Sequence, residues 1–268
     1  MVQMLYEQGL IEAPVFSIFL NNNEFTDRQA VPVSALLLGG YELDNYSHGS
    51  DFTYIPLVAA SDPSSIFWSV SMTQIAIGEV AIELSSTHAI LDTGSSYILA
   101  PSFDSYRILD VIKRVNSCAE DLVNFVCKCD SETWADFYPV LVLVLGPEKT
   151  KVRLNPQDYF FRVIVRQTNG ACQLLIDSDP NLDYWVLGAA FLRKYYVLFD
   201  LERRVIGLAP SVLSVIVENY DPSWREWMHV FVLPIIGVVL FLGAYIWMEG
   251  PCRKVPHGAD DSIQVNPA

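Results

Sequence analysis

Short apolar runs broken by glycine, proline, asparagine and aspartate cover most of the first 210 residues. Runs of this kind, rich in β-branched and aromatic side chains, predict β-strands. We expect a tight hairpin turn at Ile77-Gly78-Glu79-Val80. The pattern indicates an all-β sandwich or barrel-like body. The strands expected from it are residues 16–20, 35–38, 67–77, 80–84, 140–145, 160–165 and 174–176.

Two segments favour helices instead. Between residues 102 and 115 the apolar side chains recur close to every 3.6 residues, and Ser102 is placed to cap the first turn. A second, shorter helix is expected at 189–194, followed by a hairpin of strands 196–200 and 205–209. The apolar positions of the longer helix are Phe103, Tyr106, Ile108, Val111, Ile112 and Val115.

A long apolar run near the C-terminus predicts a membrane helix. Residues 228–248 contain no Asp, Glu, Lys or Arg, and about 20 apolar residues span a bilayer core. Aromatic residues at both ends suit the membrane interface, and the length of the run argues against a buried core helix. Arg253 and Lys254 follow it, which favours a cytosolic tail at 249–268 and a lumenal or extracellular body. Residues 211–227 are then a stalk.

The net charge indicates which partners to expect, and residues 1–8 show whether the sequence begins with a secretory signal. The net charge of −14 excludes nucleic acid as the expected partner. It suits a secreted or lumenal protein. Residues 1–8 lack the basic cap and apolar run of a secretory signal. We therefore expect either a truncated N-terminus or a start codon inside a longer gene.

The five cysteines indicate the kind of cellular compartment in which the body of the protein lies. Cys252 is on the cytosolic side of the predicted helix, where it is either palmitoylated or a plain free thiol. The other four predict two disulfides in an oxidising compartment, and three pairings are open. No metal site is expected, because the spacing does not match zinc ligands. Asn45-Tyr46-Ser47 is a glycosylation sequon. The four lumenal cysteines are Cys118, Cys127, Cys129 and Cys172.

The segment with candidate chemistry is residues 89–101, AILDTGSSYILAP. It places the carboxylate of Asp92 at a sharp turn between two core strands. Gly94 lets the backbone pass close by, and the hydroxyls of Thr93 and Ser95 are expected to hold Asp92 or neighbouring groups. Asp, Thr and Gly also form ordinary surface turns, but the apolar flanks argue against an exposed turn here.

This segment resembles the active-site signature of the pepsin-like aspartic proteases, in which apolar residues precede Asp-Thr-Gly-Ser or Asp-Thr-Gly-Thr. Further motifs of that family follow in the order it requires, between Tyr6 and Pro210. Residues 8–20 resemble the end of its N-terminal lobe, and Leu38-Gly39-Gly40 the strand that crosses to the C-terminal lobe. Later matches are residues 67–70, 185–188, 191–200 and 206–210.

The resemblance implies the C-terminal lobe of the pepsin-like acid protease fold at residues 51–210, after a remnant of the N-terminal lobe and the inter-lobe strand at 1–50. Asp92 would be the catalytic aspartate of the second lobe. Thr93, Gly94, Ser95 and Gly188 would support it. The family pattern also favours a Cys129–Cys172 disulfide over Cys127–Cys172, leaving Cys118–Cys127. Ala189 departs from the aspartate that usually follows Gly188, which bears on local stability more than on chemistry.

The implied activity is peptide-bond hydrolysis by a water that aspartate activates, without metal or cofactor. That chemistry uses two carboxylates, whereas this sequence contains one Asp-Thr-Gly. We therefore expect a membrane-anchored aspartic endopeptidase that is incomplete in this chain, acts on peptides or proteins, and needs an N-terminal lobe or a second copy. The alternative is an inactive half-protease serving as a membrane-tethered binding module.

Two further points follow from the sequence. His48, His88, His229 and His257 are scattered, so a Ser-His-Asp site has no supporting motif. A single-pass type I protein with a lumenal or extracellular body fits endolysosomal, vacuolar, Golgi and cell-surface membranes equally.

Overall fold

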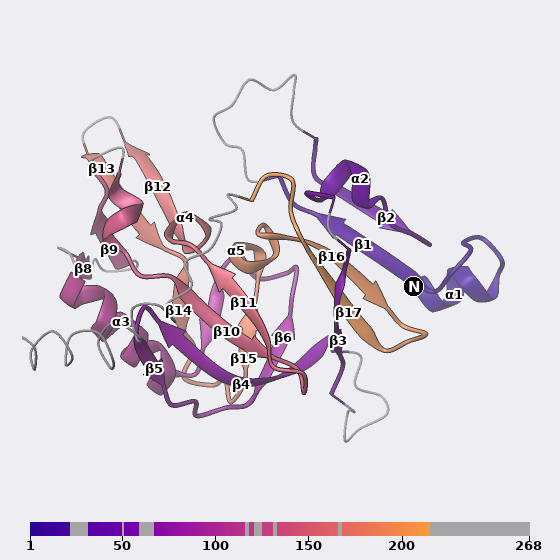
Figure 1. Ribbon diagram of the computed structural model, residues 1–268, viewed down its shortest axis with the longest axis horizontal. Coiled ribbons are helices and arrows are strands. Elements are labelled where there is room, and N and C mark those ends of the chain that lie inside the picture. The colour runs from indigo at the N-terminus through magenta and orange to yellow at the C-terminus, as the bar shows by residue number, and fades with distance from the viewer. Residues whose placement is uncertain are drawn as a thin grey trace, which may run out of the picture. The chain divides into compact units, whose positions relative to one another are not determined.

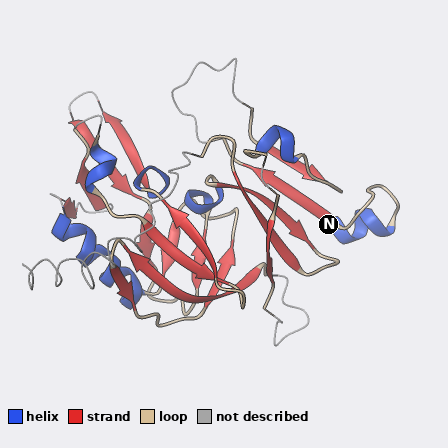
Figure 2. Ribbon diagram, viewed as in Figure 1, coloured by secondary structure: helices blue, strands red, loops and turns tan. Residues whose placement is uncertain are grey.

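Most of the described chain is β-strand, with a few short helices at the edges of the sheets (Figure 2). The computed structural model describes residues 1–21, 32–49, 51–58, 67–115, 118–120, 125–130, 133–165 and 168–214, all within the unit Met1–Ile216. The apolar runs of the sequence supply the core, because alternate strand positions such as Val70 and Met72, and Ile75 and Ile77, are fully buried. The all-β expectation is confirmed for this part of the chain.

The first sheet joins the two ends of the described chain. Its strands run in the order β2 (Ala35–Leu38), β1 (Val15–Phe19), β16 (Tyr195–Asp200), β17 (Val205–Pro210) and β3 (Thr53–Pro56). Figure 1 shows the indigo strand β1 beside the orange strand β16, and the register pairs them antiparallel. Every residue of β16 is buried, so the expected closing hairpin is the centre of this sheet.

The second sheet carries the Asp-Thr-Gly segment. Its strand order is β11-β10-β4-β6-β15-β7-β14, and β5 pairs with β4. β15 lies between β6 and β7, parallel to β6 and antiparallel to β7. The strands in chain order are β4 (Ser69–Ile77), β5 (Val80–Ile82), β6 (His88–Leu91), β7 (Ile98–Ala100), β10 (Leu141–Leu145), β11 (Thr150–Leu154), β14 (Ile176–Ser178) and β15 (Trp185–Leu187).

The third sheet holds the cysteines. Its strand order is β12-β13-β9-β8, all antiparallel. Cys118 lies on β8, Cys127 on β9 and Cys172 on β13, and Cys129 follows β9 directly. The strands are β8 (Cys118–Glu120), β9 (Phe125–Lys128), β12 (Phe160–Val165) and β13 (Thr168–Leu174).

Within the described residues, one helix is long enough to show an amphipathic pattern. α3 (Ser102–Val115) has the bounds predicted from the sequence, and it buries Ile108 and Ile112 completely. Phe103 and Tyr106, which the periodicity assigned to the apolar face, are exposed instead. The buried face begins at Asp104, one turn before Ile108. The other helices are α1 (Val2–Glu7), α2 (Leu43–Tyr46), α4 (Pro156–Tyr159), α5 (Ala189–Leu192) and the 3-10 turn Trp134–Phe137.

The predicted strands differ from the observed ones mainly at their ends. The expected hairpin at Gly78 is confirmed, with Ile77 opposite Val80. The prediction of one strand at 174–176 is wrong, because two strands meet there: β13 ends at Leu174 and β14 begins at Ile176. Between them, the Leu175 N–H donates to the carbonyl of Tyr159, and the Leu175 carbonyl accepts from the Ile98 N–H. The chain therefore passes from one sheet to the next at this residue.

Only residues 211–214 of the predicted stalk, and no residue of the predicted membrane anchor, are among the described residues. Residues 211–214, expected to begin the stalk, pack against the body: Ser211 is buried opposite Ser47, and the Val212 N–H donates to the Tyr46 carbonyl. No helix in the described part of the chain is long and apolar enough to cross a membrane. The predicted membrane segment 228–248, the tail 249–268 and Cys252 lie outside the described residues.

Candidate active site

Asp92 stands at the end of a buried strand, on a loop that the core holds from both sides. Leu91 and Ile98 flank the loop and are buried, whereas Asp92 itself is exposed. β15 runs between the two flanking strands and brings Leu187 opposite both Leu91 and Ile98. The Asp92 N–H donates to the Leu187 carbonyl at 3.2 Å. The loop is therefore anchored to the sheet at the residue that carries the carboxylate.

Gly188 lies directly behind this loop. A Cβ atom at this position would be 2.3 Å from the Tyr97 carbonyl oxygen and 2.5 Å from that of Ser95. Its φ is −84°, which any residue adopts. Glycine is therefore needed because there is no room for a Cβ atom, and not because of its backbone freedom. The close approach lets the next two N–H groups reach the loop: Ala189 donates to Ser95 at 2.7 Å and Ala190 to the Ser96 carbonyl at 3.2 Å.

The immediate surroundings of Asp92 differ from the expectation in two respects. The turn is exposed although its flanks are buried, because the chain leaves the sheet at Asp92 and returns at Ile98. The observed partner of the carboxylate is a backbone group: the Gly94 N–H donates to Asp92 Oδ1 at 2.8 Å. The Ser95 hydroxyl donates to the Tyr97 carbonyl at 3.1 Å instead of holding Asp92, and Thr93 is exposed.

A side chain from the third sheet also reaches the loop. Gln173 Nε2 donates to the hydroxyl of Tyr97 at 2.5 Å, across 76 positions of the sequence. Gln173 follows Cys172, so the same strand carries a disulfide and a contact to the Asp92 loop. This contact was not predicted from the sequence, since a lone glutamine on a strand carries no signal of its partner.

A buried carboxylate lies behind β15. Asp104 is fully buried, and its oxygens accept from the Trp185 indole N–H at 3.1 Å and from the Ser85 N–H at 2.9 and 3.1 Å. Such bonds are needed for a buried carboxylate to be tolerated. One sequence signal marks it: Asp104 precedes the buried residues Ile108 and Ile112 at helical spacing, which places an acid on the core face of α3.

A buried ion pair ties α4 to Lys194, the second residue after α5. Lys194 Nζ lies 3.1 Å from Asp158 Oδ2, and both side chains are less than a tenth exposed. Burial raises the pKa of Asp158, while the charge of Lys194 and the N–H of Asn155 act against the rise. Burial also raises the pKa of the Tyr195 hydroxyl, which donates to the backbone. Because α5 begins beside Gly188, this pair supports the segment behind the Asp92 loop.

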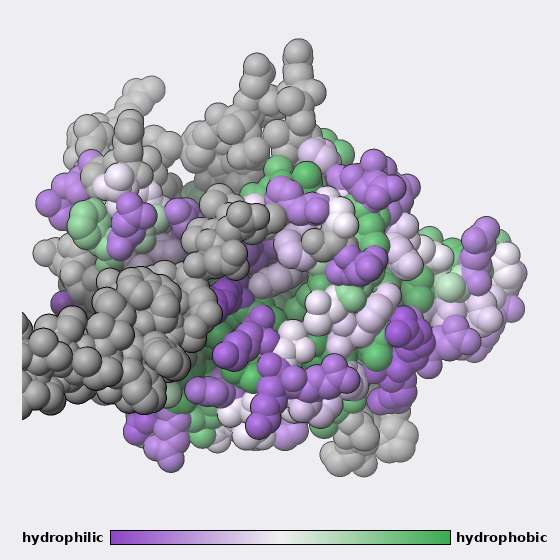
Figure 3. Space-filling model, in the orientation of Figure 1, coloured by the Kyte–Doolittle hydropathy of each residue, from purple (hydrophilic) through white to green (hydrophobic). Residues whose placement is uncertain are grey.

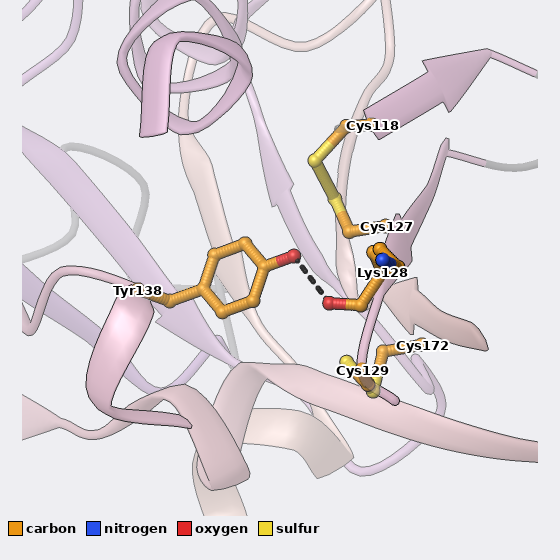
Figure 4. Close-up of a disulfide and its surroundings, with 6 residues drawn as sticks. All are labelled: Cys118, Cys127, Lys128, Cys129, Tyr138 and Cys172. Carbon is orange, nitrogen blue, oxygen red and sulfur yellow. Dashed lines mark hydrogen bonds between the residues drawn. A yellow bond between two sulfur atoms is a disulfide. The ribbon is translucent and has the colours of Figure 1, made fainter. Parts of the chain in front are cut away.

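The described residues contain two disulfides, as expected from the four cysteines other than Cys252. They join Cys118 to Cys127 and Cys129 to Cys172, the arrangement that the family resemblance favours. Figure 4 shows the two bonds on either side of Lys128, whose carbonyl accepts the Tyr138 hydroxyl at 2.8 Å. Three of the four cysteines are buried, and Cys118 is partly exposed.

The glycosylation sequon spans the end of α2 and Ser47, the residue that follows it. Asn45 is exposed, and its Nδ2 donates to Glu42 Oε2 at 2.7 Å. Ser47 is buried and donates to the Leu43 carbonyl. Asn45 is thus reachable from solvent, while the hydroxyl of the sequon is engaged in the folded body.

Comparison with known proteins gives a consistent result. The family model described as eukaryotic aspartyl protease matches residues 1–211. The chain is 28% identical over 212 residues to pregnancy-associated glycoprotein 2 of Bos taurus, 30% over 208 residues to vacuolar aspartic protease of Candida albicans, and 27% over 211 residues to cathepsin D of Bos taurus. These matches cover 78%, 76% and 77% of this chain but 49%, 44% and 49% of the relatives. The chain therefore spans about half the length of the curated relatives it matches.

Proposed function

We propose that this chain, which belongs to the eukaryotic aspartyl protease family, forms the C-terminal lobe of a membrane-anchored aspartic endopeptidase. In this proposal Asp92 is the catalytic carboxylate of the lobe, and the body extends from residue 51 to 210. Residues 1–50 are the end of the first lobe and the strand that joins the two. The activity requires a second Asp-Thr-Gly lobe, because this chain supplies one such triplet.

The observation that carries the proposal is the way the Asp92 loop is held. The strands on either side of it are tied together by β15, and Gly188 allows the backbone behind the loop to approach its carbonyl groups. The carboxylate is fixed in position while its front remains open. This arrangement suits a group that must meet a second carboxylate and a peptide from outside the lobe.

The chemistry explains why two lobes are needed. In aspartic proteases two aspartates share one proton, since two like charges so close cannot both ionise. The ionised carboxylate takes a proton from a bound water, and the protonated one donates to the carbonyl of the peptide bond. Asp92 can fill one of these roles at a time. Gly94 supplies a hydrogen bond to Oδ1, which fixes the orientation of the carboxyl group. The roles of Thr93, Ser95 and Gly188 are to shape the loop.

The exposed apolar side chains on and beside β2 offer a surface on which the rest of the N-terminal lobe would pack. Leu36 and Leu38 on β2 are 57% and 40% exposed, and β2 is an edge strand. Val33 and Tyr41, on either side of β2, are exposed as well. Figure 3 shows hydrophobic atoms reaching the surface among hydrophilic ones on the face where β1, β2 and α1 lie in Figure 1. An exposed apolar edge favours burial against a partner.

The remaining parts of the proposal concern location. Residues 228–248 form the single membrane helix, with 249–268 as a cytosolic tail, and the body is lumenal or extracellular. The two disulfides support an oxidising compartment. Asn45 is the glycosylated residue of the body. Endolysosomal, vacuolar, Golgi and surface membranes are all consistent with this topology.

The proposal is tested by cleavage of a peptide substrate at acid pH, with pepstatin as inhibitor. We expect the full chain alone to be inactive, and to become active when an N-terminal Asp-Thr-Gly lobe that completes the fold is supplied. Asp92→Asn should abolish that activity, whereas Asp51→Asn, which alters another exposed carboxylate, should leave it unchanged.

Other results would redirect the proposal. Cleavage by the chain alone, lost on Asp92→Ala, would show that two copies pair and each supplies one aspartate. Peptide binding without cleavage, even with the second lobe present, would support the membrane-tethered binding module and overturn the endopeptidase.

A further inference from the structure

The third sheet places three cysteines in a row across neighbouring strands. Cys118 on β8 lies opposite Cys127 on β9, and Cys127 also lies opposite Cys172 on β13. Cys129, two residues beyond Cys127, has its side chain on the same face of the sheet. Figure 4 shows the bonds that are formed, Cys118–Cys127 and Cys129–Cys172. Cys127 thus has a cysteine directly across on each side and is bonded to one of them.

The unused pair meets the distance requirement of a disulfide. Residues directly opposite in antiparallel strands have Cα atoms about 4.5–5.5 Å apart, and disulfides form at about 4.4–6.8 Å. The existing Cys129–Cys172 bond spans a Cα distance of 5.7 Å. A Cys127–Cys172 bond therefore needs no displacement of β9 relative to β13.

We propose that the four cysteines form a thiol–disulfide exchange relay, in which reduction at Cys118 moves the long-range cross-link from Cys129–Cys172 to Cys127–Cys172. The thiolate of a small monothiol of the glutathione class attacks Cys118 Sγ. A mixed disulfide forms there, and Cys127 leaves as a thiolate. The Cys127 thiolate then attacks Cys172 Sγ, the bond to Cys129 breaks, and Cys129 leaves as a thiolate that takes up a proton.

A second molecule of the monothiol completes the balance. It removes the first from Cys118 as the oxidised dimer, so that two electrons and two protons pass from two small thiols to the protein. The protein then holds one disulfide, Cys127–Cys172, and two thiols, Cys118 and Cys129.

Burial determines the order of the steps. Cys118 is partly exposed, whereas Cys127, Cys129 and Cys172 are 2%, 0% and 0% exposed. An external thiol reaches Cys118 first, because the sulfur that is attacked depends on access. The second step takes place between neighbours inside the sheet, without an external thiol.

The exchange frees one strand of the third sheet and leaves two others cross-linked. It removes the covalent tie of the edge strand β8, whereas β9 and β13 remain cross-linked. The new bond closes a loop only two residues longer than the old one, so its entropic contribution is nearly the same. The relay therefore releases β8 without loosening the strand that carries Gln173 and contacts the Asp92 loop.

A matched pair of variants tests the relay in the full chain, with Cys252→Ser to remove the fifth thiol. In Cys118→Ala the free thiol is Cys127, opposite Cys172. In Cys127→Ala the free thiol is Cys118, which is two strand spacings, about 9.5 Å, from Cys172. Thiols are blocked with N-ethylmaleimide at acid pH, and tryptic peptides are mapped by mass spectrometry without reduction. Cleavage after Lys128 separates Cys127, in peptide 115–128, from Cys129, in peptide 129–149.

We expect Cys118→Ala to show peptide 115–128 linked to peptide 167–193, with the maleimide on Cys129. Cys127→Ala should retain only the link between 129–149 and 167–193. Retention of that link alone in Cys118→Ala, with the maleimide on Cys127, would overturn the relay. Rearrangement in both variants would overturn it too, since that is general scrambling.

The unmutated cysteine set gives an independent measurement if Cys118→Ala does not fold. The Cys252→Ser chain is treated with rising concentrations of reduced glutathione. We expect glutathione on Cys118 together with the 115–128 to 167–193 link. Simultaneous loss of both native disulfides, without that link, would contradict the proposal.

Discussion

Replacing Gly188 with alanine tests how the Asp92 loop is held in place. The new Cβ would lie 2.3 Å from the Tyr97 carbonyl oxygen and 2.5 Å from that of Ser95. Real Cβ contacts essentially never fall below 3.0 Å, so the Tyr97 carbonyl has to move by at least 0.7 Å. The obstacle is backbone of the loop itself, which cannot rotate away as a flexible side chain would.

The cost follows from two effects. Forcing an extra carbon into a packed site costs about 1–3 kcal/mol. Moving the loop also stretches the bonds from the Ala189 and Ala190 N–H groups, at 2.7 and 3.2 Å, each worth about 1 kcal/mol. We expect Gly188→Ala to lower the free energy of unfolding by about 3–4 kcal/mol, a large part of the roughly 5–15 kcal/mol of a typical domain.

Urea denaturation followed by tryptophan fluorescence measures this change, since Trp185 is buried three residues before Gly188. Gly40→Ala is the matched control: a Cβ there meets nothing within 4 Å, and we expect a change within about 0.5 kcal/mol. A loss below about 1 kcal/mol for Gly188→Ala would refute the reasoning, because the loop would then be free to retreat.

Three further changes probe the support of the loop, each by urea denaturation. Asp104→Ala leaves a buried indole N–H and a backbone N–H without their acceptor, and should cost about 2–4 kcal/mol; an isosteric Asp104→Asn that costs as much would contradict this. Lys194→Met leaves the Asp158 carboxylate buried without its cation and should cost about 3–5 kcal/mol near neutral pH. The folded-state pKa of Asp158 is already raised, so its contribution to stability falls as pH rises through that pKa, and Lys194→Met should steepen the fall. A pH-independent cost would exclude the ion pair as its origin. Gln173→Leu should cost about 1 kcal/mol and speed amide exchange in the loop, with little added effect in Tyr97→Phe.

Helices and hairpins that depend on residues close together in the sequence could be predicted from local patterns. The period of apolar residues located α3 at its observed bounds, and the glycine between two β-branched runs located the hairpin at Gly78. The same period misassigned Phe103 and Tyr106, because it cannot tell which side of a helix meets the sheet. Short strands such as β6 and β7 were expected only as the apolar flanks of Asp92.

Contacts between segments far apart in the sequence could not be predicted from local patterns. The bond between Gln173 and Tyr97 joins residues 76 apart. The passage of β15 between β6 and β7 is a property of topology, which no pattern within either strand encodes. The expectation that hydroxyls hold Asp92 relied on residue type alone, whereas the backbone geometry of the turn brings the Gly94 N–H to its oxygen first.

The exposure of Asp92 is consistent with a catalytic role because of what lies behind it. An ordinary surface turn of Asp, Thr and Gly needs no strand threaded between its flanks and no glycine at contact distance from its carbonyl groups. Here both are present, and two N–H groups after Gly188 bond to the loop. The loop is held by packing within the described body, so in the proposed enzyme a substrate or second carboxylate would meet a fixed group. Preorganised polar groups of this kind are where enzymes obtain much of their rate enhancement.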